Sequence, residues 1–261
     1  MNIIVIGDIV GKPGRESLRN TLPTLRERYD PGLVIANGEN AAGGAGINEK
    51  TYWEIRDCGV DVVTAGNHTW DRKEIFQFID TEYNLIRPAN YPEKTTPGRG
   101  VTVFWVEKEQ CNVAIINLLG RVFMTPVDCP FMAADRELER LTGKAHVVVV
   151  DFHAEATSEK EAMGWYLDGR VGAVIGTHSH VQTADERILP QGTAYITDAG
   201  MTGLYDSILG VDPAGPLKRF ITKLPCQLKI SSGRTMFNAV IIHIDRKSGK
   251  ADSIERIFHI Y

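Results

Sequence analysis

Short apolar runs rich in valine and isoleucine alternate along the chain with segments that show a helical spacing of apolar positions. The runs cover residues 3–6, 33–36, 60–64, 113–118, 146–150 and 171–175. The segments between them predict helices over residues 15–29, 49–57, 73–79, 133–141 and 158–167. Strands buried on both faces and separated by helices are typical of a parallel sheet between helical layers. We therefore expect an α/β fold with a mainly parallel central sheet and helices packed outside.

Local signals refine this expectation at the helix starts and near the C-terminus. Gly14, Asn48 and Ser158 stand at or just before three predicted helices, and Ser158 with Glu161 resembles a capping box. After Pro225 the pattern predicts strands over 227–231, 236–245 and 253–260, with a Ser-Gly-Arg turn after the first, so the C-terminal portion is expected to be antiparallel. Neither Pro/Gly-rich loop, 91–100 or 213–216, separates two segments that could each form a core. The prediction is one domain over residues 1–261.

Polar residues follow five of the apolar runs. They are Asp8 after Gly7, the stretch Asn37-Gly38-Glu39-Asn40, the triplet Gly66-Asn67-His68, the triplet Asp151-Phe152-His153, and Gly176-Thr177-His178-Ser179-His180. In a parallel sheet the carboxyl ends of the strands lie at one edge, where open α/β folds place their ligands. Carboxylate, amide and imidazole groups are thus predicted to meet at one rim.

Each of these signals is weak alone, because Asp8 serves equally well as a cap and a single His153 is more often a core histidine. The pair His178 and His180 is stronger, since residues i and i+2 of extended backbone project to the same side. Together the five segments predict a metal site. Oxygen and imidazole donors without thiolate suit manganese, iron or zinc. The donors outnumber the needs of one ion, so we expect two ions bridged by a carboxylate, an arrangement that suits the hydrolysis of phosphate esters.

Composition and charge exclude several other classes of protein. Lys and Arg total 29 against 33 Asp and Glu, and this net charge of −4 disfavours non-specific DNA binding. The longest apolar stretches, such as 113–119, fall far short of the roughly 20 residues that cross a bilayer, so no membrane span is expected. The four cysteines are scattered and predict neither a disulfide framework nor a zinc knuckle. With no secretory leader at Met1, we expect a cytoplasmic protein.

The order of the motifs resembles the calcineurin-like metallophosphoesterase superfamily. The stretches 7–11, 37–41 and 151–155 are further similar to its YmdB-like bacterial branch. The resemblance implies a layered metallophosphoesterase fold and a dinuclear phosphodiesterase active on 2′,3′-cyclic nucleotides by in-line attack of a metal-bridging hydroxide. It also implies iron or manganese, as divalent or mixed-valence ions, and a homo-oligomer. A small phosphodiester, including one derived from RNA, is the substrate class that it implies.

The chain departs from the superfamily pattern at two places. Val10 stands where the usual Asp-x-His motif has its histidine, and Glu39 with Asn40 replaces the usual Gly-Asp followed by Arg. By resemblance to the branch, Asn40 takes the coordination place of the missing histidine. The resemblance then implies a first ion held by Asp8, Glu39, Asn40 and His180. It implies a second ion held by Glu39, Asn67, His153 and His178.

His68 follows Asn67 directly, and neighbours in extended chain point to opposite sides. If Asn67 binds metal, His68 is free to face the substrate as the general acid that protonates the leaving alkoxide. The alternative is a histidine that only orients a metal ligand. The nearest basic residues in sequence are few, namely Lys12, Arg15 and Arg72, which favours a diester over a monoester dianion.

Two other functions remain open on these residues. One is a phosphomonoesterase or protein phosphatase that uses the same site, since fold and ions do not fix the substrate. The other is a regulator that retains the metal site but acts by binding RNA or a protein. The Gly43-Gly44-Ala45-Gly46 segment is read either as a loop that needs positive φ or as a phosphate-binding turn.

Overall fold

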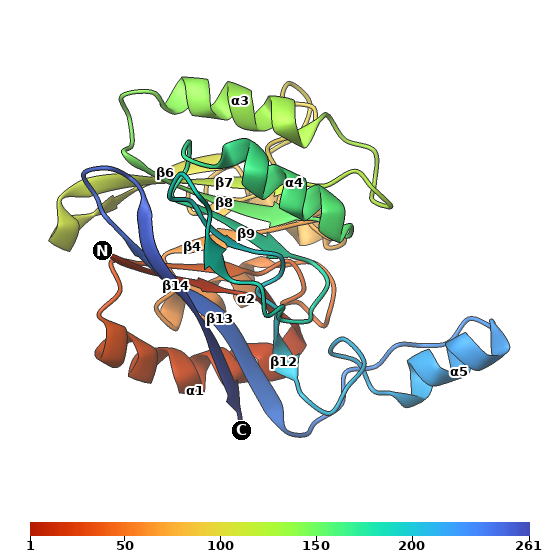
Figure 1. The fold of residues 1–261 in the computed structure, drawn as a ribbon. Helices are drawn as coiled ribbons and strands as arrows, with labels where there is room; N and C mark the ends of the chain where they lie inside the picture. Colours follow the sequence, from red (N-terminus) through yellow and green to blue (C-terminus); the bar gives the residue numbers. More distant parts are fainter.

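A computed structural model describes residues 1–261, which form two β-sheets stacked face to face with helices on both outer sides (Figure 1). The first sheet has the strand order β2-β12-β13-β1-β3-β4-β5, with β14 paired to β13. Its strands are β1 (Asn2–Ile6), β2 (Asp8–Ile9), β3 (Leu33–Asn37), β4 (Val62–Thr64), β5 (Leu85–Ile86), β12 (Met201–Leu204), β13 (Thr235–Ile244) and β14 (Ala251–Ile260). Strands β1, β3, β4 and β5 are parallel, whereas β13 runs antiparallel to β1, β12 and β14.

The second sheet has the order β10-β11-β9-β8-β7-β6. Its strands are β6 (Val101–Val106), β7 (Cys111–Leu119), β8 (Val147–His153), β9 (Ala173–Thr177), β10 (Arg187–Ile188) and β11 (Ala194–Ile196). The four inner strands β7, β8, β9 and β11 are parallel, and the edge strands β6 and β10 are antiparallel to their neighbours. The second sheet therefore has a parallel centre and antiparallel margins, whereas in the first sheet the parallel strands run to the edge at β5 and the antiparallel strand β13 lies in the interior.

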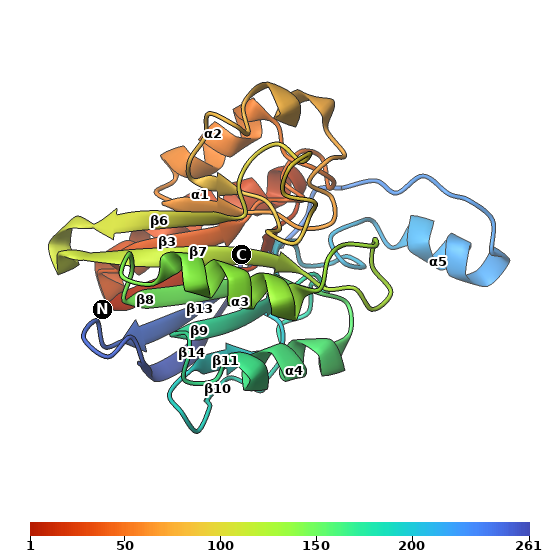
Figure 2. The same ribbon diagram turned by 90° about the horizontal axis from the view of Figure 1, so that it is seen from above.

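The helices cover the outer face of each sheet (Figure 2). Helices α1 (Gly11–Tyr29) and α2 (Glu49–Asp57) lie on the first sheet, and α3 (Pro130–Leu141) and α4 (Thr157–Leu167) lie on the second. Two short 3-10 helices, η1 (Lys73–Gln77) and η2 (Glu107–Glu109), and helix α5 (Ala214–Thr222) complete the fold. No helix is both long enough and apolar enough to span a bilayer.

Alternation along β1 shows how the layers are joined. Ile3 and Val5 face the other sheet and share a buried cluster with Ile115 of β7, whereas Ile4 and Ile6 face α1. Successive side chains of a strand point to opposite faces, so a strand that is apolar at every position is buried on both faces. Three apolar layers result: one between the sheets and one under each pair of helices.

The α/β class, the mainly parallel strands, the outer helices and the antiparallel C-terminal portion are confirmed. The parallel strands are divided between two stacked sheets, a detail that the expectation of a central sheet did not specify. A strand covered by a helix on one face and by a second sheet on the other has the same apolar pattern as a strand between two helical layers. The local pattern therefore identifies the strands but not the sheet to which each belongs.

Three helix starts also differ from the prediction, and α3 begins at Pro130 rather than at residue 133. Helix α1 begins at Gly11, because Pro13 fits the first turn, where its missing N–H is not needed. Helix α4 begins at Thr157, and its N-cap Ala156 makes no side-chain bond, so the predicted Ser158 capping box does not form. At α2 the expectation is met: Asn48 Oδ1 accepts from the Thr51 amide at 2.9 Å, and the side chain of Thr51 accepts in return from the Asn48 amide.

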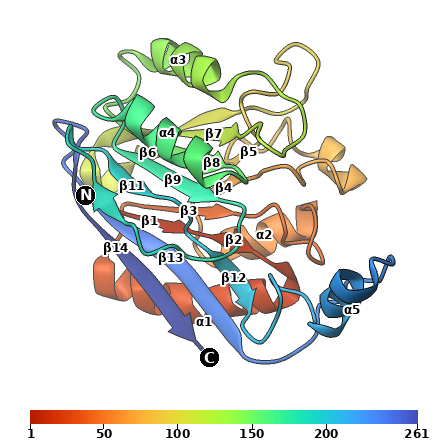
Figure 3. The same ribbon diagram turned by 45° about the vertical axis from the view of Figure 1, so that its right-hand side comes forward.

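The C-terminal third contains a wrong strand prediction and an element that was not predicted. Residues 227–231 form no strand, because their backbone has no partner strand, and the antiparallel hairpin is built from β13 and β14 alone. Helix α5 and the chain on either side of it project from the body as an arm (Figures 1 and 3). We call residues 212–231 the arm.

Candidate metal centre

The five predicted strand ends do converge, but they come from both sheets. In the first sheet, the junction of β1 with β2 brings Asp8, and the ends of β3 and β4 bring Glu39, Asn40, Asn67 and His68. The ends of β8 and β9 in the second sheet bring His153, His178 and His180. The rim is therefore the place where the carboxyl ends of two stacked sheets meet.

His153 is the centre of the cluster. Its Nε2 atom lies 3.0 Å from Glu39 Oε1, 3.0 Å from Asn67 Oδ1 and 3.0 Å from His178 Nδ1. One ligand atom each from Glu39, His153 and His178 lies within 4.8 Å of the others, which is close enough for all three to hold one ion. Glu39 and His153 are fully buried, and His178 is partly exposed.

A second group of predicted ligands adjoins the first. The amide nitrogen of Asn40 lies 3.2 Å from His180 Nε2 and 3.2 Å from Glu39 Oε1. Asp8 Oδ1 lies 3.9 Å from His180 Nε2 and 3.8 Å from His153 Nδ1. Glu39 thus contacts both groups, which is the position that a bridging carboxylate requires.

The donor set fits a cation better than it fits a closed hydrogen-bond network. Three atoms that can accept a hydrogen bond surround His153 Nε2: Glu39 Oε1, Asn67 Oδ1 and His178 Nδ1. Since Nε2 carries at most one proton, it cannot satisfy all three as a donor. Asp8 Oδ1 is buried and has no hydrogen-bond partner, whereas Asp8 Oδ2 accepts from the His178 amide at 3.1 Å. An unpartnered buried carboxylate oxygen costs free energy unless something positive faces it.

Gly66 shows how tightly the cluster is built. A Cβ atom on this residue would lie 2.3 Å from Glu39 Oε2 and 2.4 Å from His153 Nε2. Any side chain at this position would therefore collide with the side chains of Glu39 and His153. The glycine that precedes Asn67 and His68 in the motif is explained by this close approach.

The charges of Glu39 and His178 favour the forms that bind metal, whereas His153 has to lose its Nε2 proton to do so: burial lowers the pKa of this ring, but the carboxylates of Glu39 and Asp8 outweigh burial and raise it to about 9. Burial raises the pKa of Asp8 to about 6. Burial opposes ionisation of Glu39 as well, but the adjacent imidazolium of His153 outweighs it and lowers the pKa of Glu39 to about 2. Burial, with the charge of His153 nearby, lowers the pKa of His178 to about 3. At neutral pH, Glu39 is an anion and His178 a neutral imidazole, the states in which both act as ligands.

The backbone between the last two histidines differs from the expected extended chain. Strand β9 ends at Thr177, and His178 and His180 have φ values of 99° and 65°. Positive φ at a residue other than glycine is strained and persists only where the surroundings impose it. The argument from extended spacing is therefore wrong, although both rings reach the cluster.

Sequence reasoning missed the residues that impose this conformation. Asp198 accepts from the amide of Ser179 at 3.0 Å and from its hydroxyl at 2.8 Å, and buried Lys160 pairs with Asp198 at 2.7 Å. Asp198 follows β11, and Lys160 lies within α4, so neither stands in a motif with the histidines. Only their burial in the folded chain indicates this supporting role.

His68 lies where the buried cluster meets solvent. Its side chain is 38% exposed, and its amide donates to Glu39 Oε2 at 3.0 Å. It stands in a turn after β4 rather than in extended chain, and its Nδ1 bonds Asp71 Oδ2 at 2.7 Å. Asp71 is a third residue that sequence reasoning missed, although its i+3 spacing from His68 is a usable signal. The contact orients the ring and leaves Nε2 free.

The basic residues near the motifs are engaged by the protein itself. Arg15 Nε pairs with Glu54 at 2.6 Å, and Arg72 donates to the carbonyls of Ala42 and Ala45 at 2.5 and 3.0 Å. Gly43, Gly44 and Gly46 in this loop all have positive φ, as one of the two interpretations expected. The loop is thus fixed by an arginine that is not available to bind a phosphate.

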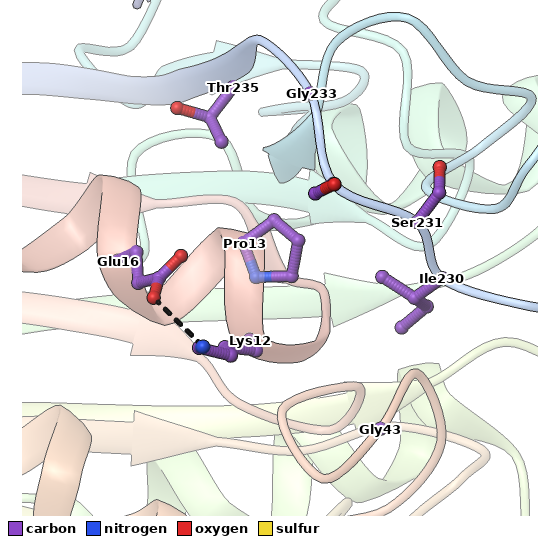
Figure 4. Close-up of a pocket in the computed structure, with 9 residues that line it drawn as sticks. Lys12, Pro13, Glu16, Gly43, Ile230, Ser231, Gly233 and Thr235 are labelled. Carbon is purple, nitrogen blue, oxygen red and sulfur yellow. Dashed lines mark ion pairs between the residues drawn. The ribbon is translucent and has the colours of Figure 1, made fainter.

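Beside this loop lies a cavity of about 440 Å³ at the start of α1 (Figure 4). Lys12 pairs there with Glu16 at 3.5 Å, and Ile230 from the end of the arm stands next to Gly43 and Pro13. Leu209, just before the arm, places its carbonyl 3.3 Å from His180 Nδ1. The base of the arm therefore contacts both the glycine loop and one of the predicted ligands.

Comparison with known proteins agrees with the resemblance. The family described as YmdB-like protein matches residues 4–257. A Bacillus subtilis relative named 2′,3′-cyclic-nucleotide 2′-phosphodiesterase is 53% identical over 98% of this chain and 96% of its own length.

Two solved structures share the fold over the whole chain. A hypothetical protein from Thermus thermophilus superposes with a TM-score of 0.92 at 43% identity, covering 100% of this chain and 99% of that one. A structure described as a novel phosphatase from Mycoplasma pneumoniae superposes with a TM-score of 0.93 at 34% identity, covering 100% and 93%. A Mycoplasma genitalium relative named putative phosphatase/phosphodiesterase is 34% identical over 98% of this chain and 92% of its own length, and with the Bacillus subtilis relative it confirms the expected enzyme class, a phosphoric diester hydrolase. The chain belongs to the YmdB-like family.

Proposed function

We propose that this chain is a metal-dependent phosphodiesterase that hydrolyses 2′,3′-cyclic nucleotides, with two ions bound at the rim between the sheets. The observation that carries the proposal is the convergence of Glu39, His153 and His178. The name of the Bacillus subtilis relative supports the substrate class.

The ligand roles follow the contacts of each side chain. Asp8, Asn40 and His180 with Glu39 would hold the first ion, and Asn67, His153 and His178 with Glu39 the second. For Asn40 to bind through its oxygen, its amide has to turn so that the oxygen replaces the nitrogen that faces His180. When bound, iron or manganese ions supply Lewis acidity to a phosphoryl oxygen and a nucleophile at neutral pH.

The chain itself supplies the leaving-group chemistry. Opening a cyclic phosphate releases a ribose oxygen that needs a proton, and His68 is the residue that we propose to donate it from Nε2. Asp71 accepts from Nδ1 and holds the ring in one orientation. The amide of His68 holds Glu39, so the proposed acid and the proposed bridge are fixed relative to one another.

The engaged arginines favour a diester as the substrate. A phosphate monoester carries two negative charges and needs extra cationic contacts, whereas a diester carries one. Arg15 and Arg72 bond to Glu54 and to backbone carbonyls, and Lys12 is paired with Glu16. This observation favours a diesterase over a phosphomonoesterase or protein phosphatase.

The test compares kcat/KM for a 2′,3′-cyclic nucleotide, an aryl diester and an aryl monoester under one metal condition. We expect the cyclic nucleotide to be hydrolysed best and all activity to be lost on chelation. A clear preference for the monoester would contradict the substrate assignment. Metal binding without hydrolysis of any of the three would favour the regulator instead.

The homo-oligomer is a second proposal, and the arm is the surface that supports it. Phe220 and Ile221 of α5 are 67% and 80% exposed, and a nine-residue helix is too short to be stable in water without packing. The arm has four basic residues and one acidic, a charge of +3, whereas the remaining 25 basic and 32 acidic residues give −7. An apolar and basic arm is complementary in charge to the acidic body of a second copy of this chain. A second copy is also a partner that is always available.

Light scattering on the full chain tests this surface. The double substitution F220D/I221D is expected to give a monomer, because it removes apolar area and reverses the local charge. Phe123, which is 90% exposed and outside the arm, provides the control substitution F123D. A wild-type chain that is already monomeric would exclude the proposal.

A further inference from the structure

Asp151 is a buried carboxylate that none of the proposed chemistry uses. It lies in β8, two residues before His153, and it accepts from three side chains. Thr177 Oγ1 donates to Oδ1 at 2.7 Å, Asn37 Nδ2 donates to Oδ2 at 3.3 Å, and the Thr64 hydroxyl also donates to Oδ2. Thr64 and Asn37 belong to the first sheet, whereas Asp151 and Thr177 belong to the second, so the carboxylate joins the two sheets at the rim.

Thr177 connects this carboxylate to His153. Its Oγ1 lies 2.9 Å from His153 Nδ1. A hydroxyl has one proton, and a carboxylate can only accept, so the proton of Thr177 is given to Asp151. Thr177 Oγ1 then accepts from His153, which places a proton on Nδ1; the amide nitrogen of Asn37, 3.4 Å from Nδ1, directs its two protons to Asp151 and to the carbonyl of Ala65. The Nε2 atom, which faces Glu39 and His178, is left as the ring atom that can bind a cation.

Asn37 extends the network to the proposed bridging residue. Its Nδ2 donates to Asp151, and its Oδ1 accepts from the amide of Glu39 at 3.1 Å. The same carboxylate thus reaches one ligand in each sheet, His153 through Thr177 and Glu39 through Asn37. Hydrogen bonds of this kind fix the tautomer and the orientation of metal-binding histidines.

We infer that Asp151, acting through Thr177, is a positioning residue that holds His153 in the Nδ1–H tautomer and so sets the affinity of the second metal ion. The inference rests on the proposed function, since it presupposes that His153 binds metal. It assigns Asp151 no contact with substrate.

Thr177 and Thr64 make a matched pair for the test, because both donate to Asp151 but only Thr177 reaches His153. T177V and T64V each remove one hydroxyl from the carboxylate at nearly constant volume. A merely structural role of Asp151 predicts the same loss from both. The positioning role predicts that T177V alone weakens metal binding by about 10- to 100-fold, the usual effect of losing such a partner, and that T177S restores it.

Two measurements report the result without activity. Competition of Mn²⁺ with a chelator gives the affinity of each site, and ¹⁵N NMR of the histidine rings gives the tautomer of His153. We expect wild type, T64V and T177S to retain the Nδ1–H form and T177V to lose its preference. Equal affinities for T177V and T64V, or an unchanged tautomer in T177V, would overturn the inference. A wild-type chain that binds no Mn²⁺ would instead refute the proposed function.

Discussion

The two sheets contribute different chemistry to the same rim. The first sheet brings the oxygen donors Asp8, Glu39, Asn40 and Asn67, and the second brings the imidazoles of His153, His178 and His180. In the proposed metal site each half alone would be an incomplete ligand set, with carboxylate and amide oxygens on one side and imidazole nitrogens on the other. The difference teaches that the site depends on the packing of the two sheets, which the apolar layer between them maintains.

The largest expected effect comes from removing the charge that both halves share. Glu39→Gln is expected to lower kcat by about 10³-fold or more, because the neutral amide cannot hold two cations while keeping nearly the same size. Circular dichroism should show an intact fold, and elemental analysis should show fewer than two ions per chain. Glu16→Gln, an exposed carboxylate on α1, is the control for charge alone. Full activity with both ions bound would show that Glu39 is not the bridge.

A smaller loss is expected from His68, the one imidazole on the side of the oxygen donors. His68→Ala is expected to lower kcat by about 10²-fold, which is within the range for a lost general acid, while the metal content stays unchanged. His178→Ala, on the other sheet, is expected to deplete the second ion. Metal analysis of the two variants separates the roles, and depletion in the His68 variant would favour the alternative in which this ring only orients a ligand.

Removal of the ions is expected to lower the thermal stability of the protein, because the proposed ligands come from both sheets. Ions that bind the folded chain at 100 times their dissociation constant stabilise it by about 2.7 kcal/mol. For a chain of this size that corresponds to a rise in Tm of about 5 to 10 °C. Scanning calorimetry with Mn²⁺ and with a chelator measures the difference. Identical Tm values under both conditions would mean that the rim does not bind these ions.

The smallest effect is expected when the amide of Asn40 is replaced by a carboxylate. Asn40→Asp adds a second carboxylate beside Glu39, so we expect lower stability without metal and about tenfold tighter binding of the first ion. The gap in Tm between the metal-free and the loaded protein should widen relative to wild type. A gap that narrows would show that Asn40 does not face the first ion.

How much of this could be predicted from the sequence differs between strands and sheets. Residues 33–36 and 49–57 lie in β3 and α2, with α2 at the predicted bounds, because apolar spacing and the cap at Asn48 are local signals. The division into two sheets was not predictable in this way, since Val34 and Val149 are equally buried and equally apolar. Pairing depends on contacts between distant residues, which no local period records.

The candidate site shows the same limit. Strand ends that carry Asp8, Glu39 and His153 can be recognised as motifs, because polar groups interrupt apolar runs there. Asp198 and Thr177 support the site through single contacts that exist only after folding. Helix α5 was missed because it has only nine residues and begins within the Pro/Gly-rich stretch 213–216, which predicts a loop.

At His178 and His180 the left-handed backbone lowers the stability of the fold while it brings both imidazoles to the proposed metal site. A strained residue of this kind costs about 1 to 3 kcal/mol, and glycine would relieve that strain. A metal-free chain with His180→Gly is therefore expected to unfold at a higher temperature than the wild type while losing a proposed ligand of the first ion. Selection for heat resistance alone would thus erode this loop. A thermostable variant of the protein should be sought by substitutions elsewhere.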